Sequence, residues 1–453
     1  MKRPFVPAPL PALLDRHRER LAAILPRAMR PTVDGRYLHW DTLRRRRPRP
    51  DDLSASEWWT GIRLARAQQS RPLPLRDARG RPFTYMLPDR VQEALHLIDS
   101  RASGRIGVAE AVTNQATRDR FIVNSLIREA ITSSQLEGAS TTRAAATRMI
   151  RANRQPRNRS ERMILNNYLA MHQIREISDR PLTPDGVLAL HRTVTFGTLD
   201  DPAAGGRLQG PGADRVEVRD GRTELVLHRP PPAEQLPERL RAMVRFANAD
   251  TGEQVTVEPF LHPLIRAIVL HFCLGYDHPF ADGNGRTARA LFYWAMLHRG
   301  YWMFEFVSIS PFLKTAPAQY ARAFLHTETD DGDVTYFILH QVDVILRAID
   351  ELDRYIDRKV AQVQRVEQML RHRTDLNHRQ LALLAHAARH PGEEYTTRSH
   401  MTSHNVAYAT ARADLFHLAE IGLLDRRRRG RKLHVFLAPL DLDERIRSVT
   451  AGG

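Results

Sequence analysis

The segment from 278 to 289 reads His-Pro-Phe-Ala-Asp-Gly-Asn-Gly-Arg-Thr-Ala-Arg and follows an apolar stretch at 264–276. Proline at 279 cannot continue a helix, and the two glycines allow a tight loop before helical spacing resumes at 287–297. The sequence therefore predicts a helix, a loop and a second helix. The amides of a glycine-bearing loop at a helix N-terminus form an anion site, because the helix dipole favours negative charge there.

The charged side chains of this segment fit a phosphate-bearing ligand. Arg286 and Arg289 are three residues apart, so they reach the same side of a helix and offer planar donors to phosphate oxygens. Asp282 offers the hard oxygen that Mg²⁺ prefers, and His278 is a proton acceptor nearby. A base, a metal ligand, an anion cradle and charge clamps are the minimum set for phosphoryl or nucleotidyl transfer.

The same segment resembles the signature of the Fic (filamentation induced by cAMP) family, His-x-Phe-x-Asp/Glu-Gly-Asn-Gly-Arg-x-x-Arg, at every specified position. The resemblance implies a protein adenylyltransferase, an AMPylator. His278 would deprotonate a Tyr, Thr or Ser hydroxyl of a target protein, and that hydroxyl would attack the α-phosphate of ATP. Asp282 would hold Mg²⁺, Arg286 would stabilise the phosphate charge, and Arg289 would bind the γ-phosphate. The phosphate cradle would consist of Gly283, Asn284 and Gly285. Because Gly285 is not the lysine of phosphorylating members, AMP transfer is favoured over kinase chemistry.

A second motif lies upstream, where residues 133–138 read Ser-Ser-Gln-Leu-Glu-Gly. They resemble the inhibitory helix of Fic proteins, Ser/Thr-x-x-x-Glu-Gly/Asn. The resemblance implies that Glu137 pairs with Arg289 and blocks productive placement of the γ-phosphate. In some relatives this glutamate positions a water that removes AMP, so an enzyme that mainly removes AMP stays open. The alternative for Glu137 is a helix-surface or capping carboxylate near Arg128 or Arg143.

The predicted fold is mainly α, a Fic-type helical bundle with a β-hairpin flap and a small winged-helix domain. We expect an N-terminal accessory region at 1–107, a Fic catalytic domain at 108–372 and a winged helix-turn-helix domain at 373–453. A β-hairpin is expected over 215–227, with its turn at 220–221. The hairpin around 216–225 resembles the flap of Fic proteins, and this resemblance implies that it aligns a target segment by main-chain pairing. Capping boxes are predicted at Ser54 with Glu57 and at Asn377 with Gln380.

Charge and the C-terminal domain together suggest a nucleic-acid partner. The chain carries 68 basic and 52 acidic residues, a net charge of +16, which favours acidic or phosphate-bearing partners. In the winged-helix resemblance, 403–420 would be the recognition-type helix and 426–432 a basic wing that contacts DNA phosphates. The alternatives are a domain that docks on the catalytic core or mediates a homodimer. The competing class of protein is a DNA-binding regulator that uses the Fic site as a nucleotide sensor.

The remaining expectations concern the compartment. The single cysteine, Cys273, cannot form an intrachain disulfide, which suits a reducing cytosol. No stretch approaches the 18 apolar residues that a spanning helix needs. We therefore expect a cytoplasmic protein with no membrane partner, which uses ATP as substrate and acts on an unidentified target protein that could be the chain itself.

Overall fold

The computed structural model describes residues 2–102, 115–212, 215–219, 225–249, 260–371, 376–429 and 433–451, most of them in helices. Two compact units are present. The first contains the described residues of 1–104 and 124–349, and the second contains those of 105–123 and 350–453. The predicted domain boundaries at 107 and 372 fall outside the described residues and stay predictions. Within the described ranges, no helix is long and apolar enough to cross a membrane.

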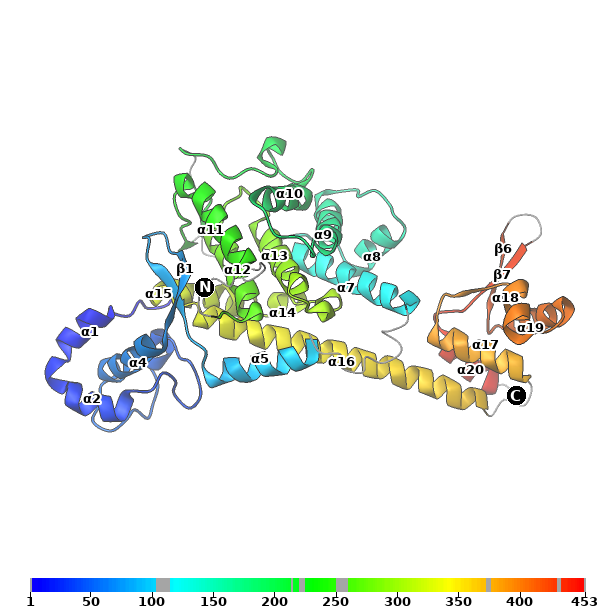
Figure 1. Ribbon diagram of the computed structural model, residues 1–453, viewed down its shortest axis with the longest axis horizontal. Helices are drawn as coiled ribbons and strands as arrows, with labels where there is room; N and C mark the ends of the chain where they lie inside the picture. Colours follow the sequence, from blue (N-terminus) through cyan, green and yellow to red (C-terminus); the bar gives the residue numbers. More distant parts are fainter. Residues whose placement is uncertain are drawn as a thin grey trace. The chain divides into compact units, whose positions relative to one another are not determined.

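The centre of the first unit is a pair of adjacent helices, α12 (Pro263–Asp277) and α13 (Asn284–His298), which appear in green in Figure 1. Helix α12 is mostly apolar, and nearly all of it is buried, as expected for a core helix. Three further helices pack around the pair: α9 (Arg159–Glu176), α10 (Pro184–Thr195) and α11 (Leu236–Asn248). The 278–289 segment therefore contains the loop that joins these two core helices.

Other helices complete the first unit, and two of them extend into the second. The α-helices are α1 (Leu10–Arg16), α2 (Leu21–Ala28), α3 (Trp40–Leu43), α4 (Ala55–Gln69), α5 (Asp89–Ala102), α7 (Gln115–Leu136), α8 (Arg143–Arg151), α14 (Ser310–Thr315), α15 (Pro317–Thr329) and α16 (Thr335–Arg371). The 3₁₀ helices are η1 (Arg18–Arg20), η2 (Pro202–Ala204), η3 (Ala233–Gln235) and η4 (Trp302–Glu305). The units are joined through α7 and α16, whose residues belong to both.

Two short antiparallel hairpins lie in the first unit. Strand β1 (Arg71–Arg76) pairs with β2 (Pro82–Tyr85), and β3 (Val218–Arg219) pairs with β4 (Val226–His228). In the second hairpin Val218 lies opposite His228. This pairing confirms the predicted hairpin, while its predicted turn at 220–221 lies outside the described residues.

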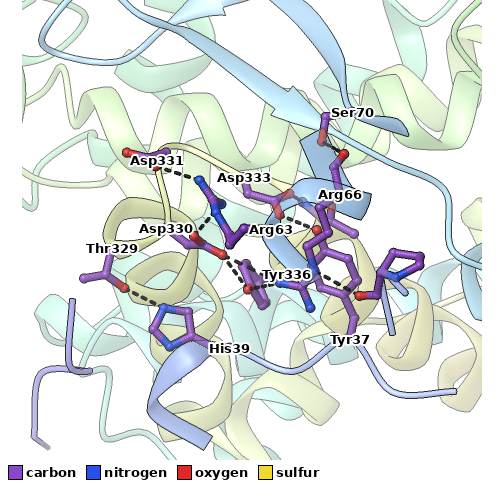
Figure 2. Close-up of polar contacts among 12 residues, drawn as sticks. Tyr37, His39, Arg63, Arg66, Ser70, Thr329, Asp330, Asp331, Asp333 and Tyr336 are labelled. Carbon is purple, nitrogen blue, oxygen red and sulfur yellow. Dashed lines mark hydrogen bonds and ion pairs between the residues drawn. The ribbon is translucent and has the colours of Figure 1, made fainter. Parts of the chain in front are cut away.

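A buried polar network fixes the N-terminal residues on the body of the first unit (Figure 2). Arg63 of α4 donates to Asp330 at 2.6 Å, and Arg66 of the same helix donates to the Tyr336 hydroxyl at 2.8 Å. That hydroxyl in turn donates to Asp330 at 2.7 Å. Asp330 is fully buried, so these partners compensate the cost of removing its charge from water. Residues of the predicted accessory region are thus part of the first unit.

The second unit ends in helices around a small sheet. Its helices are α17 (His378–Arg389), α18 (Thr397–His404), α19 (Tyr408–Glu420) and α20 (Leu442–Ala451). Its strands are β5 (Glu394–Tyr395), β6 (Asp425–Arg429) and β7 (Leu433–Leu437), in the order β5-β7-β6. A buried apolar cluster built on Leu384, Leu415 and Phe436 holds them together.

The predicted single helix over 403–420 is wrong. Helix α18 ends at His404 because Asn405 adopts a left-handed conformation with φ of 50°, and α19 begins only at Tyr408. Asparagine tolerates this conformation well and commonly ends helices. Ser403 therefore lies inside α18 and does not cap the following helix.

Candidate functional site

The loop between α12 and α13 begins and ends with residues of positive φ. His278 is the C-cap of α12, with φ of 45°, and Gly283 is the N-cap of α13, with φ of 82°. A Cβ added at Gly283 would lie 2.6 Å from Cγ2 of Thr195, so only glycine fits this position without a shift. Helix α13 begins at Asn284, three residues earlier than the periodicity predicts, because the second glycine, Gly285, is already helical.

The side chain of Asn284 closes this loop internally. Its Oδ1 accepts the Phe280 N–H at 2.9 Å, and its Nδ2 donates to the Phe280 carbonyl at 2.8 Å. The residue is 2% exposed. Both ends of the amide are therefore engaged, and Asn284 offers a ligand only its main chain.

His191 of α10, which sequence reasoning missed, packs against the loop between α12 and α13. Its ring stacks on Phe280 with centroids 3.7 Å apart, and its Nδ1 accepts the Gly206 N–H at 2.9 Å. The other nitrogen, Nε2, therefore carries the proton and donates to the Asp282 carbonyl at 2.8 Å. Burial lowers the pKa of His191 to about 4, so the ring is neutral at pH 7.

His278 is half-buried, and its ring is also neutral at pH 7. Burial lowers its pKa to about 4, and the nearby His228 and Arg215 act in the same direction. A hydrogen bond to the Gly275 carbonyl and the charge of Glu137 oppose this shift. A neutral imidazole is the form that accepts a proton, as a general base must.

Asp282 and Arg286 lie close together at the start of α13. One Asp282 oxygen accepts the Gly283 N–H at 2.5 Å and lies 3.6 Å from Arg286 Nη2, and the other lies 3.5 Å from Arg159 Nη2. The Asp282 side chain is 40% exposed, so it retains lone pairs for a cation. In the part of the chain that the structure describes, no three His, Cys, Asp or Glu side chains group to hold a metal. A single carboxylate nonetheless fits Mg²⁺, which commonly takes one or two carboxylates together with substrate phosphates.

The guanidinium of Arg286 is fully buried and incompletely bonded. Its Nη1 donates to the Val194 carbonyl at 3.0 Å, while Nε and Nη2 donate to no acceptor among the described residues. Burial lowers its pKa, although a guanidinium stays charged. Unsatisfied buried donors on a charged group are costly, and a phosphate would satisfy them.

Arg289 is buried against the end of α7. Its Nε donates to the Ser133 hydroxyl at 2.8 Å, and its Nη2 donates to the Ser133 carbonyl at 3.0 Å and to Glu137 at 2.8 Å. Ser133 and Glu137 are four residues apart and therefore face the same way. A Cβ built on Gly285 would lie 2.1 Å from a Glu137 carboxylate oxygen. Glu137 is thus at the N-terminal turn of α13, where it pairs with Arg289.

The turn after α7 explains why glycine follows Glu137. Gly138 has φ of 93°, its N–H donates to the Gln135 carbonyl at 3.2 Å, and the Ala139 N–H donates to the Ser134 carbonyl at 3.0 Å. These two bonds form a Schellman motif, which requires a left-handed residue at the position of Gly138. The motif ends the helix so that Glu137 lies at its C-terminus, beside Arg289.

A buried carboxylate anchors α7 two turns before Glu137. Glu129 is 2% exposed and accepts hydrogen bonds from the Ser308 hydroxyl at 2.8 Å and the Ser310 N–H at 3.1 Å. Glu129, Ser133 and Glu137 recur every four residues along one face of the helix. The position of Glu137 is therefore fixed by the helix as well as by its own contact.

Residues 181–296 match the model of the Fic/DOC family, and this range includes α10, the flap strands, α12 and the whole 278–289 segment. This part of the chain is similar to the Fic/DOC family domain. The chain is similar to proteins named protein adenylyltransferase Fic. It is 28% identical to that of Drosophila melanogaster over 191 residues, 41% of this chain and 33% of the relative. To that of Drosophila erecta it is 26% identical over 265 residues, 57% of this chain and 48% of the relative.

The chain thus spans between a third and a half of the length of these relatives. Among solved structures, it is similar to a Fic family protein from Desulfovibrio desulfuricans G20, with a TM-score of 0.48 and 18% identity. That similarity covers 76% of this chain and 94% of the other. A second similar structure is Fic-1 from C. elegans, with a TM-score of 0.44, 20% identity, and coverage of 59% of this chain and 71% of the other.

Proposed function

We propose that the protein transfers AMP from ATP to a Tyr, Thr or Ser hydroxyl of a target protein. The observation that carries the proposal is a pair of features at one loop. The buried guanidinium of Arg286 has donors without an acceptor in the described part of the chain, and the loop begins at His278, whose ring is neutral. The hydroxyl oxygen attacks the α-phosphorus and loses its proton to His278. The bond between the α-phosphorus and the bridging oxygen breaks, and pyrophosphate leaves.

The polar and glycine residues that the signature specifies each have a role in this reaction. The main chain of Gly283, Asn284 and Gly285 lies at the N-terminus of α13, where amides and helix dipole favour phosphate oxygens. Arg286 donates its free N–H groups to the phosphates, and Arg289 binds the γ-phosphate. Asp282 would hold Mg²⁺, which neutralises charge on the phosphates when bound.

We propose further that Glu137 holds this enzyme in an inhibited state. Glu137 occupies Arg289 Nη2 at 2.8 Å, a donor that the γ-phosphate needs. Because carboxylate and phosphate compete for one buried donor, ATP can bind productively only after Glu137 moves. The resting rate of transfer is therefore low.

A double-label experiment tests the reaction type. The Glu137→Gly protein is incubated with Mg²⁺ and ATP labelled either at the α- or at the γ-phosphate, with and without cell lysate. AMP transfer predicts label on protein from α-labelled ATP alone, and label without lysate reports modification of the chain itself. Label from γ-labelled ATP would contradict AMP transfer. If a modified protein instead loses AMP, and Glu137→Gly abolishes that loss, AMP removal is the main activity.

The C-terminal residues favour a second function, DNA binding by a winged-helix domain. The turn at 405–407 separates α18 from α19 as in a helix-turn-helix, and the exposed face of α19 carries Tyr408 and Arg412. The guanidiniums of Arg412 and Arg426 lie 4.6 and 5.2 Å from the Phe416 ring, which joins the helix to the basic strand β6. Residues 430–432 of the predicted wing lie outside the described residues.

Fluorescence anisotropy with duplex DNA over a salt series tests this second function. Binding that weakens steeply with salt and is lost in Arg412→Ala would support it. Equal anisotropy with and without the protein at low salt would refute it. Sequence-selective binding together with ATP binding but no AMP transfer would favour the regulator that senses nucleotide at the Fic site.

A further inference from the structure

One arginine fastens both ends of the flap to the last turn of α12. Arg215 precedes β3, and its Nη2 donates to the carbonyls of Asp277 at 2.6 Å and His278 at 3.1 Å. Its Nε donates to the carbonyl of Pro231, which follows β4, at 2.7 Å. A single guanidinium therefore joins the start of the hairpin, its end and the backbone of the proposed base.

His228, the last residue of β4, makes a parallel connection. It lies opposite Val218 in the hairpin, and its Nε2 lies 2.6 Å from the Tyr276 carbonyl. A carbonyl can only accept, so Nε2 carries the proton. The other ring nitrogen, Nδ1, lies 2.9 Å from the Glu328 carboxylate, and this contact is an ion pair when the ring carries both protons.

Gln209 adds a third connection from the segment that leads into the flap. Its Nε2 donates to the Phe280 carbonyl at 2.7 Å and to the His278 carbonyl at 3.3 Å, and its Oε1 accepts the Val216 N–H at 3.3 Å. The same side chain thus touches the flap and the loop.

The C-terminus of α12 suits these donors for a physical reason. The last carbonyls of a helix have no partner within the helix, and the helix dipole makes that end negative. A guanidinium and an imidazole N–H supply the missing hydrogen bonds. Because both donors come from the ends of the hairpin, the flap is attached to the C-terminal end of α12, directly before His278.

We infer that Arg215 and His228 are positioning residues that couple the flap to His278, so that a target segment paired with the flap lies at a fixed place relative to the histidine ring. The inference rests on the proposed AMP transfer. It adds an explanation of how the target segment is positioned relative to the base, His278. A segment that pairs with the main chain of β3 or β4 inherits the position of these strands. The two residues also help keep His278 neutral, since both lower its pKa against the opposing charge of Glu137.

The test compares variants of the Glu137→Gly protein. Arg215→Gln removes the positive charge and the short hydrogen bonds of the guanidinium. Arg215→Lys retains a positively charged ammonium that can still donate to one carbonyl. The matched control is Arg229→Gln, because Arg229 is also at the base of the flap but its side chain is 79% exposed and its Nε donates to the Glu217 side chain at 3.0 Å. The rate of transfer from α-labelled ATP to lysate proteins and the affinity for Mg²⁺-ATP by calorimetry are measured for each.

Coupling predicts that Arg215→Gln and His228→Ala each lower the rate at least tenfold while ATP affinity stays within twofold. Arg215→Lys should recover part of the rate, and Arg229→Gln should stay within twofold of the parent. Equal rates for Arg215→Gln and Arg229→Gln would overturn the inference. A parallel loss of rate and ATP affinity would also overturn it, because it would mean general damage to the site.

A second readout separates this inference from the proposed reaction. The imidazole signals of His278 are followed by NMR in the full chain with labelled histidine, assigned with His278→Ala. Arg215→Gln should raise the pKa of His278 and shift its signals, whether or not the parent transfers AMP. Inactivity of the Glu137→Gly parent would refute the proposed reaction alone. Unchanged His278 signals in Arg215→Gln would refute the coupling.

Discussion

Replacing Glu137 with glutamine removes the negative charge that lies beside Arg289 but leaves an amide oxygen that can accept a hydrogen bond. The contact is 2.8 Å long, and the Arg289 side chain is 2% exposed. A hydrogen bond to a charged group contributes about 1.5–3 kcal/mol, and about 1.4 kcal/mol corresponds to a tenfold change in affinity. Because 30% of the Glu137 side chain is exposed, solvent screens part of this energy. We therefore expect Mg²⁺-ATP to bind about tenfold more tightly to Glu137→Gln.

Calorimetry with two nucleotides tests this expectation. Glu137 competes for the donor that binds the γ-phosphate, so the affinity for ADP should change much less than the affinity for ATP. A matched control is Glu238→Gln, since Glu238 is exposed and pairs with Arg241 and Arg245. It should alter neither affinity. An equal gain for ATP and ADP, or no gain for either, would refute the competition between Glu137 and the γ-phosphate.

Three further predictions follow from buried polar groups. Asn284→Ala removes both bonds that close the loop and should lower the free energy of unfolding by about 1–3 kcal/mol per unsatisfied group, measured by urea titration; an unchanged midpoint would contradict the role of the side chain. Asp330→Ala removes the buried carboxylate that pairs with Arg63 and Arg66 and should cost about 3–5 kcal/mol, whereas Asp331→Ala, whose side chain is 42% exposed, should cost far less. Equal losses would contradict the account of this network. The pKa of His278 and of His191 falls from 6.5 to about 4 on folding. As pH falls, the unfolded chain therefore protonates these histidines before the folded chain does, and the free energy of unfolding should decrease between about pH 6.5 and pH 4. Urea midpoints that rise as pH falls over this range would contradict this prediction.

Local sequence patterns predicted the elements that local contacts determine. The capping boxes at Ser54 with Glu57 and at Asn377 with Gln380 are confirmed, because a cap and its partner are three residues apart. The helix-loop-helix at 278–289 is also confirmed, since proline and glycine restrict the backbone directly.

Long-range partners were missed for a physical reason. His191 contacts a carbonyl 91 residues away, and Arg215 contacts carbonyls more than 60 residues away. Their partners are main-chain atoms, which every residue has, so the sequence carries no signal for the pairing. The start of α19 was misplaced because Ser403 resembles a capping residue, whereas the left-handed conformation of Asn405 ends the helix before it.

The most direct measurement is the transfer of label from α-labelled ATP to protein by three chains: the original sequence, Glu137→Gly, and Glu137→Gly with His278→Ala. Autoinhibited AMP transfer predicts strong labelling by the single variant, weak labelling by the original sequence and none by the double variant. Labelling that is equal in all three, or absent from all three while each is folded and binds ATP, would contradict the account.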